Sequence, residues 1–176
     1  NSYWPNGIWY ARPLPGYPTK FVAVISGHHG VPRMGELVIF DTGKGRQEDT
    51  GAVQRIPGYG KPVKGLIKDT LVDDSWPKFL HPYPLSDKYF LVSCKPTPAS
   101  AWGIYLVDIF DNMLLLKEEP GWALFEPLPI RLVTVKLPPR RSASLRERGR
   151  PSPVPRLRFG RPLRSCTYSS KLSAWA

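Results

Sequence analysis

The sequence lacks a long apolar run and contains only two cysteines in 176 residues. No stretch approaches the roughly 18 apolar residues that a membrane-spanning helix requires. Cys94 and Cys166 can form neither a C-x-x-C-H haem attachment sequence nor a zinc knuckle nor a disulfide framework. A phosphate-binding loop, a dinucleotide fingerprint and a G-x-S-x-G nucleophile motif are also absent from the sequence. Nucleotide-dependent and serine hydrolase chemistry are therefore unsupported.

Proline, in contrast, is abundant, with 21 residues. An internal proline removes a helical hydrogen bond and clashes with the preceding turn, so this composition disfavours long helices. The chain is 41% hydrophobic and 12% aromatic, which is enough to bury a core. An all-helical fold and a fully disordered chain are both excluded.

Charge divides the chain into two parts. Residues 1–130 contain 13 basic and 13 acidic side chains, whereas residues 131–176 contain 12 basic side chains and one acidic side chain, Glu147. The whole net charge of +11 therefore belongs to the C-terminal part. We expect a folded domain over residues 1–131 and a disordered tail, rich in Arg, Pro and Ser, over residues 132–176.

Short segments rich in β-branched and aromatic residues recur between Gly- and Pro-containing turns, a pattern typical of an all-β fold. The expected strands are 20–26, 35–41, 51–56, 88–93, 103–110 and 113–117. Asp111-Asn112 is the expected two-residue link of the last hairpin. Residues 59–80 are either an insertion or a poorly patterned extra segment.

Two parts of the chain also resemble each other. When Phe21 is aligned with Tyr89, each copy has an aromatic-led strand, a loop and a second strand that ends in Asp41 or Asp108. Radially stacked four-stranded sheets predict such copying, because each sheet covers its neighbour's apolar face. We therefore expect a partial β-propeller of about two blades, each a four-stranded antiparallel sheet; a β-sandwich is the alternative.

The runs KFVAVISGHHG, GELVIFDTGKGR, PYPLSDKYFLVS and WGIYLVDIFDNMLLL, followed by EEPGWALFEPLPIR, resemble the middle domain of the hydrazine synthase alpha-subunit family over about residues 1–131. The resemblance implies a propeller from a large exported bacterial protein, in the periplasm or outside the cell. It also implies that haem c, if present, is attached outside this chain, because no C-x-x-C-H sequence occurs here. The sequence starts without Met and reads as a fragment of such a protein.

His28 and His29, between Gly27 and Gly30, are the candidate metal ligands, because imidazole is a common ligand on a strand-end turn. An ordinary glycine loop is the alternative interpretation. His81 is expected to pack or to form a turn. The acidic pairs Asp73-Asp74 and Glu118-Glu119 are expected to be solvated, and Asp41 and Asp108 to accept hydrogen bonds from turn amides. No catalytic residue is assigned.

The tail after Ile130 breaks the resemblance abruptly. It is a basic arm, a linker to a further domain, or text produced by a reading-frame slip, and composition alone does not separate these alternatives. An arm of clustered arginines would attract nucleic acid or anionic lipid.

Three functions follow from these patterns. The first is a non-catalytic scaffold that docks neighbouring blades, haem domains or a partner protein. The second is a part of a c-type-haem oxidoreductase, to which side chains such as His28 or Tyr83 contribute. The third is nucleic-acid binding through the tail.

Overall fold

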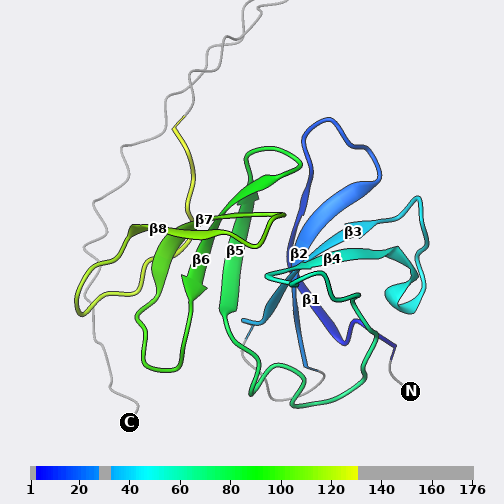
Figure 1. Cartoon of the computed structure of the whole chain (residues 1–176), viewed down its shortest axis with the longest axis horizontal. Coiled ribbons are helices and arrows are strands. Elements are labelled where there is room, and N and C mark those ends of the chain that lie inside the picture. Colours follow the sequence, from blue (N-terminus) through cyan, green and yellow to red (C-terminus); the bar gives the residue numbers. More distant parts are fainter. Residues whose placement is uncertain (1–2, 28–32, 131–176) are drawn as a thin grey trace, which may run out of the picture. The chain divides into compact units, whose positions relative to one another are not determined.

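The computed structural model describes residues 3–27 and 33–130, which form two four-stranded antiparallel sheets (Figure 1). The first sheet contains β1 (Gly7–Pro13), β2 (Lys20–Ser26), β3 (Glu36–Asp41) and β4 (Ala52–Ile56). The second contains β5 (Lys78–Pro84), β6 (Tyr89–Lys95), β7 (Gly103–Asp108) and β8 (Met113–Lys117). One 3-10 helix, η1 (Glu48–Gly51), precedes β4. The expected all-β class is confirmed for the described residues, where no helix is long and apolar enough to cross a membrane.

Within each sheet the strands lie in sequence order, so every neighbouring pair is connected directly along the chain. Neither sheet closes on itself in the described part of the chain. The strands β2, β3, β4, β6, β7 and β8 lie close to their expected ranges. β7, however, ends at Asp108, so four residues and not two connect it to β8.

Sequence patterning missed β1 and β5, which are the first strands of their sheets. Their sequences are GIWYARP and KFLHPYP, and each strand has a bulge that breaks the alternation of side chains. Proline is tolerated there because an edge strand has one side that forms no ladder. Residues 57–77, between β4 and β5, contain no strand.

The two sheets have the same pairing register in their first two strands. Trp9 lies opposite Val24, and Leu80 lies opposite Ser93. A residue of β5 therefore lies 71 positions after its counterpart in β1, and a residue of β6 lies 69 positions after its counterpart in β2. The internal repeat is thus a structural repeat, and β1 and β5 belong to it.

The expected alignment within the repeat is wrong by one residue. Phe21 lies opposite Pro13, whereas Phe90 lies opposite Pro84. The counterpart of Phe21 is therefore Phe90 and not Tyr89. The loop after β6 (residues 96–102) is two residues shorter than the loop after β2 (residues 27–35), so counterparts are 69 positions apart in β2 and β6 but 67 apart in β3 and β7. A single offset of 68 positions therefore misses each strand by one residue.

The sheets pack with opposite faces in contact. The first sheet contributes Val22, Val24, Leu37 and Ile39 to the shared core. The second sheet contributes Phe90, Val92, Cys94, Tyr105 and Val107. The counterparts of that second set are Phe21, Ala23, Ile25, Val38 and Phe40, which lie on the other face of the first sheet, in a cluster with Trp4 and Val63. Two equivalent sheets are therefore stacked head to tail.

Candidate functional site

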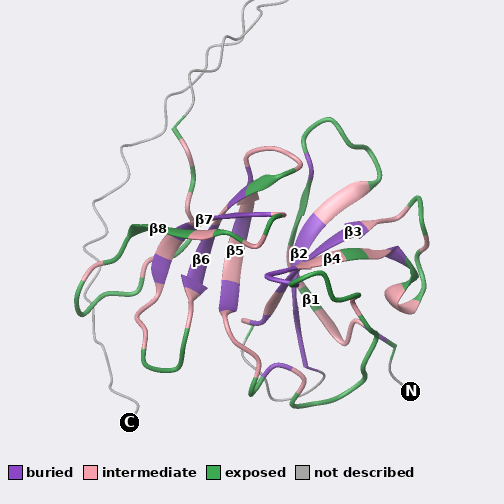
Figure 2. Cartoon of the chain, viewed as in Figure 1, coloured by how far each residue is buried: buried purple, intermediate pink, exposed green. Residues whose placement is uncertain are grey.

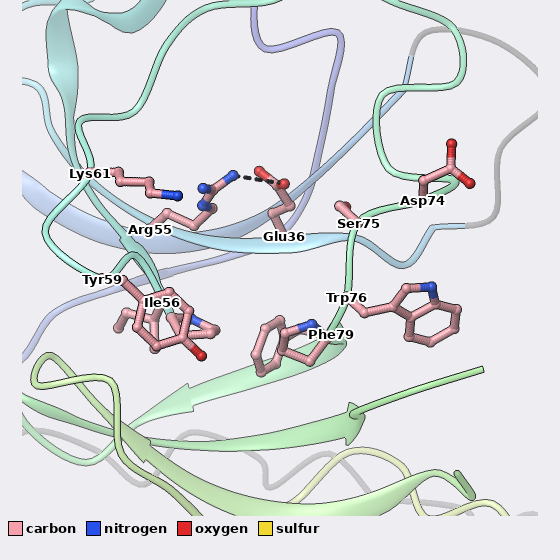
Figure 3. Close-up of a pocket in the computed structure, with 11 residues that line it drawn as sticks. Glu36, Arg55, Ile56, Tyr59, Lys61, Asp74, Ser75, Trp76 and Phe79 are labelled. Carbon is pink, nitrogen blue, oxygen red and sulfur yellow. Dashed lines mark hydrogen bonds and ion pairs between the residues drawn. The ribbon is translucent and has the colours of Figure 1, made fainter. Parts of the chain in front are cut away.

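A pocket of about 300 Å³ lies beside the end of β4 and the start of β5 (Figure 3). One side carries the polar side chains of Lys61, Arg55 and Glu36. The Arg55 guanidinium donates a hydrogen bond of 3.0 Å to the Glu36 carboxylate. The Glu36 side chain is only 15% exposed, so this ion pair holds the polar side of the pocket in place.

The opposite side of the pocket is aromatic and apolar, with Tyr59, Ile56, Phe79 and Trp76 (Figure 3). A flat apolar surface facing a row of charges can hold a small polar molecule that has one apolar face. The Ser75 hydroxyl is already hydrogen-bonded to a backbone carbonyl, and no histidine is among the described lining residues. These residues provide recognition groups and no nucleophile paired with a base.

Lys78, at the start of β5, is a buried lysine, with 2% of the residue exposed. Its Nζ lies 5.0 Å from the centre of the Trp76 ring and has no hydrogen-bond partner. Burial lowers the pKa of Lys78, although the nearby carboxylates of Asp73, Glu36 and Asp74 oppose this effect. Sequence patterning does not indicate that this amine is buried, because a lysine at a strand start is usually solvated.

A smaller cavity, of about 140 Å³, adjoins Tyr10, His81 and Glu126. All three residues have a positive φ, of 55°, 48° and 54° respectively. The Tyr10 and His81 rings are 4.3 Å apart, and Nε2 of His81 lies 3.8 Å from Oε1 of Glu126. Left-handed backbone is costly for a residue other than glycine, and here His81 contacts both of the other left-handed residues.

The outer face of the second sheet is an apolar surface that its strands leave partly uncovered. On it, Leu91, Ile104 and Leu106 are half-buried, whereas their counterparts Val22, Leu37 and Ile39 in the first sheet are at most 4% exposed. Leu114 of β8 lies opposite Leu106 and is 58% exposed. Figure 2 shows this exposure along β8.

The candidate metal ligands His28 and His29 lie outside the described residues. Among the described residues no group of three or more His, Cys, Asp or Glu side chains could hold a metal ion. Asp73, Asp74 and Glu118 are exposed, as expected, whereas Glu119 is half-buried. Glu119 forms an ion pair with Lys117, and Asp73 and Asp74 lie near Lys78.

Asp41 and Asp108 occupy equivalent turns, as expected. Asp41 accepts a hydrogen bond from the Gly43 amide, and Asp108 accepts one from the Phe110 amide. Burial alone would raise the pKa of Asp108, but hydrogen bonds from Asn112 and Phe110 outweigh it and hold the pKa below its usual value. These carboxylates stabilise the turns at the ends of β3 and β7.

Cys94 is fully buried in the core, as expected for a small apolar side chain, and burial raises its pKa to about 12. The aromatic residues serve several roles. Trp4 is buried, Trp9 donates a hydrogen bond to the Ser26 hydroxyl, and Trp122 is 71% exposed.

Comparison with protein-family models, curated proteins and solved structures finds no match to this chain.

Proposed function

We propose that this chain is a scaffold and interaction module, a part of a β-propeller that docks neighbouring sheets or a partner protein. The head-to-tail stacking of its two sheets is the observation that carries this proposal. A stack in which opposite faces meet has a different apolar face at each end, so it can be extended by another sheet of the same kind. A sandwich of two sheets that join their equivalent faces would have no such ends.

The end face of the stack is the outer face of the second sheet. Its half-buried Leu91, Ile104 and Leu106 occupy positions that the first sheet buries almost completely. Contiguous exposed apolar surface of this kind is typical of an interaction site. Since the described pockets offer recognition groups without a nucleophile, binding explains the geometry better than catalysis.

The resemblance to the hydrazine synthase alpha-subunit middle domain agrees with this role. It implies an exported multi-domain protein, where the propeller would support haem domains that carry the redox chemistry. This context is part of the proposal and rests on the sequence runs alone.

The test changes the end face without changing the core. In Leu106→Glu/Leu114→Lys, opposite charges replace two leucines that lie directly across β7 and β8. We expect the native chain to bind an apolar dye and to self-associate in sedimentation velocity, and the double variant to lose both properties. Val53→Lys, which replaces an exposed apolar side chain of β4, is the control. Equal behaviour of the native chain and the double variant would contradict the proposal.

A further inference from the structure

The first strands of the two sheets have a third copy in the sequence. β1 continues as GIWYARPL over residues 7–14, and β5 continues as KFLHPYPL over residues 78–85. Residues 123–130 read ALFEPLPI. In all three copies the second and third residues are apolar, the fourth varies, the seventh is proline and the eighth is aliphatic. A tryptophan lies one to three residues before each copy, at Trp4, Trp76 and Trp122.

The backbone conformation supports this alignment. The fourth residue of each copy is Tyr10, His81 or Glu126, and these residues have φ values of 55°, 48° and 54°. In β1 and β5 this residue lies in the bulge between the paired parts of the strand. The bulge and the left-handed backbone conformation occur at the same position of the repeat, so both belong to the repeated structure.

The third copy also contacts the second sheet as β5 contacts the first sheet. The Phe79 amide donates a hydrogen bond of 2.8 Å to the Gly35 carbonyl, just before β3. The counterparts are Leu124, 45 positions after Phe79, and Trp102, 67 positions after Gly35. The Leu124 amide donates a hydrogen bond of 3.0 Å to the Trp102 carbonyl.

Side-chain contacts repeat in the same order. Tyr10 packs on His81, with ring centres 4.3 Å apart, and the next such pair is His81 with Glu126, at 3.8 Å between Nε2 and Oε1. Phe125 also contacts the rings of His81 and Trp102. Residues 123–130 thus contact the second sheet in the same way as β5 contacts the first sheet.

From these observations we infer that residues 123–130 are the first strand of a third sheet, and that the outer face of the second sheet receives the other three strands of that sheet. The inference rests on the proposed interaction role and names the occupant of that face. The described residues contain no strand after β8, and the exposed leucines of β8 lie where the later strands of the third sheet would pack.

The repeat specifies the chemistry of the occupant. It is a three-stranded antiparallel sheet whose first strand pairs with residues 123–130 and presents alternating large apolar side chains to the outer face. In the second sheet this role belongs to Phe90, Val92 and Cys94, with Tyr105 and Val107 from the next strand. A polar peptide or a single helix would not provide both the strand pairing with residues 123–130 and the apolar packing on the outer face.

The first experiment supplies three strands of this kind. A second copy of residues 86–117 is inserted after Ile130 in the full chain, because Ile130 is the counterpart of Leu85. We expect amide exchange in residues 123–130 to slow by about tenfold or more, since strand pairing protects the edge amides. The matched control carries Phe90→Asp and Val92→Asp in the inserted copy only. Equal exchange with both inserts would overturn the inference.

A second experiment does not depend on folding of the insert. In the original chain, Glu126→Gly retains access to the left-handed conformation, whereas Glu126→Val is strained there. We expect amide exchange in residues 123–130 to become several-fold faster in Glu126→Val than in Glu126→Gly. Equal rates in the two variants would show that the third copy is not held as a bulged strand.

These outcomes are separate from the test of the interaction role. If Leu106→Glu/Leu114→Lys abolishes dye binding while the intact insert gives no protection, the end face binds a partner and the assigned occupant is wrong. If the insert protects residues 123–130 but the native chain shows neither dye binding nor self-association, the third strand is correct and the interaction role fails.

Discussion

Gly35 and Phe79 exchange two backbone hydrogen bonds, of 2.8 and 3.3 Å, and so form a bridge between the first and second sheets. The bridge fixes the position of the start of β5 relative to the first sheet. It depends on the absence of a side chain at Gly35, since a Cβ atom there would lie 1.9 Å from the Ile25 carbonyl oxygen.

Gly35→Ala is therefore expected to destabilise the chain by about 1–3 kcal/mol, the usual cost of forcing an extra atom into packed structure. Urea unfolding followed by tryptophan fluorescence measures the change. Gly65→Ala is the control, because no atom would lie closer than 3.4 Å to a Cβ atom at Gly65. A native-like midpoint for Gly35→Ala would show that the bridge is dispensable.

Asp111 connects the last hairpin to the loop after β4. Its carboxylate accepts hydrogen bonds of 2.8 Å from the Gly58 amide and 2.6 Å from the Tyr59 amide. Asp111→Asn keeps a residue type that tolerates the φ of 68° but turns one acceptor into a donor. We expect a loss of about 1–3 kcal/mol in unfolding free energy. Glu119→Gln, which removes a surface ion pair with Lys117, should change it much less; equal losses would contradict this role for Asp111.

Asp108 should make the fold sensitive to acid. Its folded-state pKa lies below the unfolded value of about 3.9. The stability it contributes is therefore present above pH 4 and is lost as the pH falls through the lowered pKa. Urea midpoints measured from pH 5 to pH 2.5 should fall less steeply in Asp108→Asn than in the native chain. The same slope in both would assign the acid sensitivity to other carboxylates, and Glu118→Gln is the control.

Lys78 should make stability rise with pH as well, but in the alkaline range. Because its folded-state pKa is lowered, the folded chain releases this proton before the unfolded chain does, and stability rises as the pH approaches about 10. Lys78→Met removes the buried cation, so we expect a higher urea midpoint at pH 7 and a smaller gain between pH 7 and pH 9.5. Lys95→Met, at the opposite position on β6, is the control. A lower midpoint for Lys78→Met would show that the ring contact with Trp76 outweighs burial.

The sequence by itself determined the all-β class, because proline and glycine punctuation leaves room only for short strands. It also determined six of the strands and the turn roles of Asp41 and Asp108, since alternation and local hydrogen bonding act over a few residues. The candidate metal ligands His28 and His29 remain predictions from the sequence.

Only the tertiary structure decided the rest. The bulged strands β1 and β5 contain prolines and have an interrupted alternation, so their apolar residues can be assigned to a face only when the neighbouring strand is present. The burial of Lys78, the ion pair of Arg55 with Glu36 and the head-to-tail packing all join residues that are distant in sequence or that depend on such contacts. Long-range packing selects among the registers and faces that local patterns leave equivalent, and this is why the repeat could be read from the sequence while its direction of stacking could not.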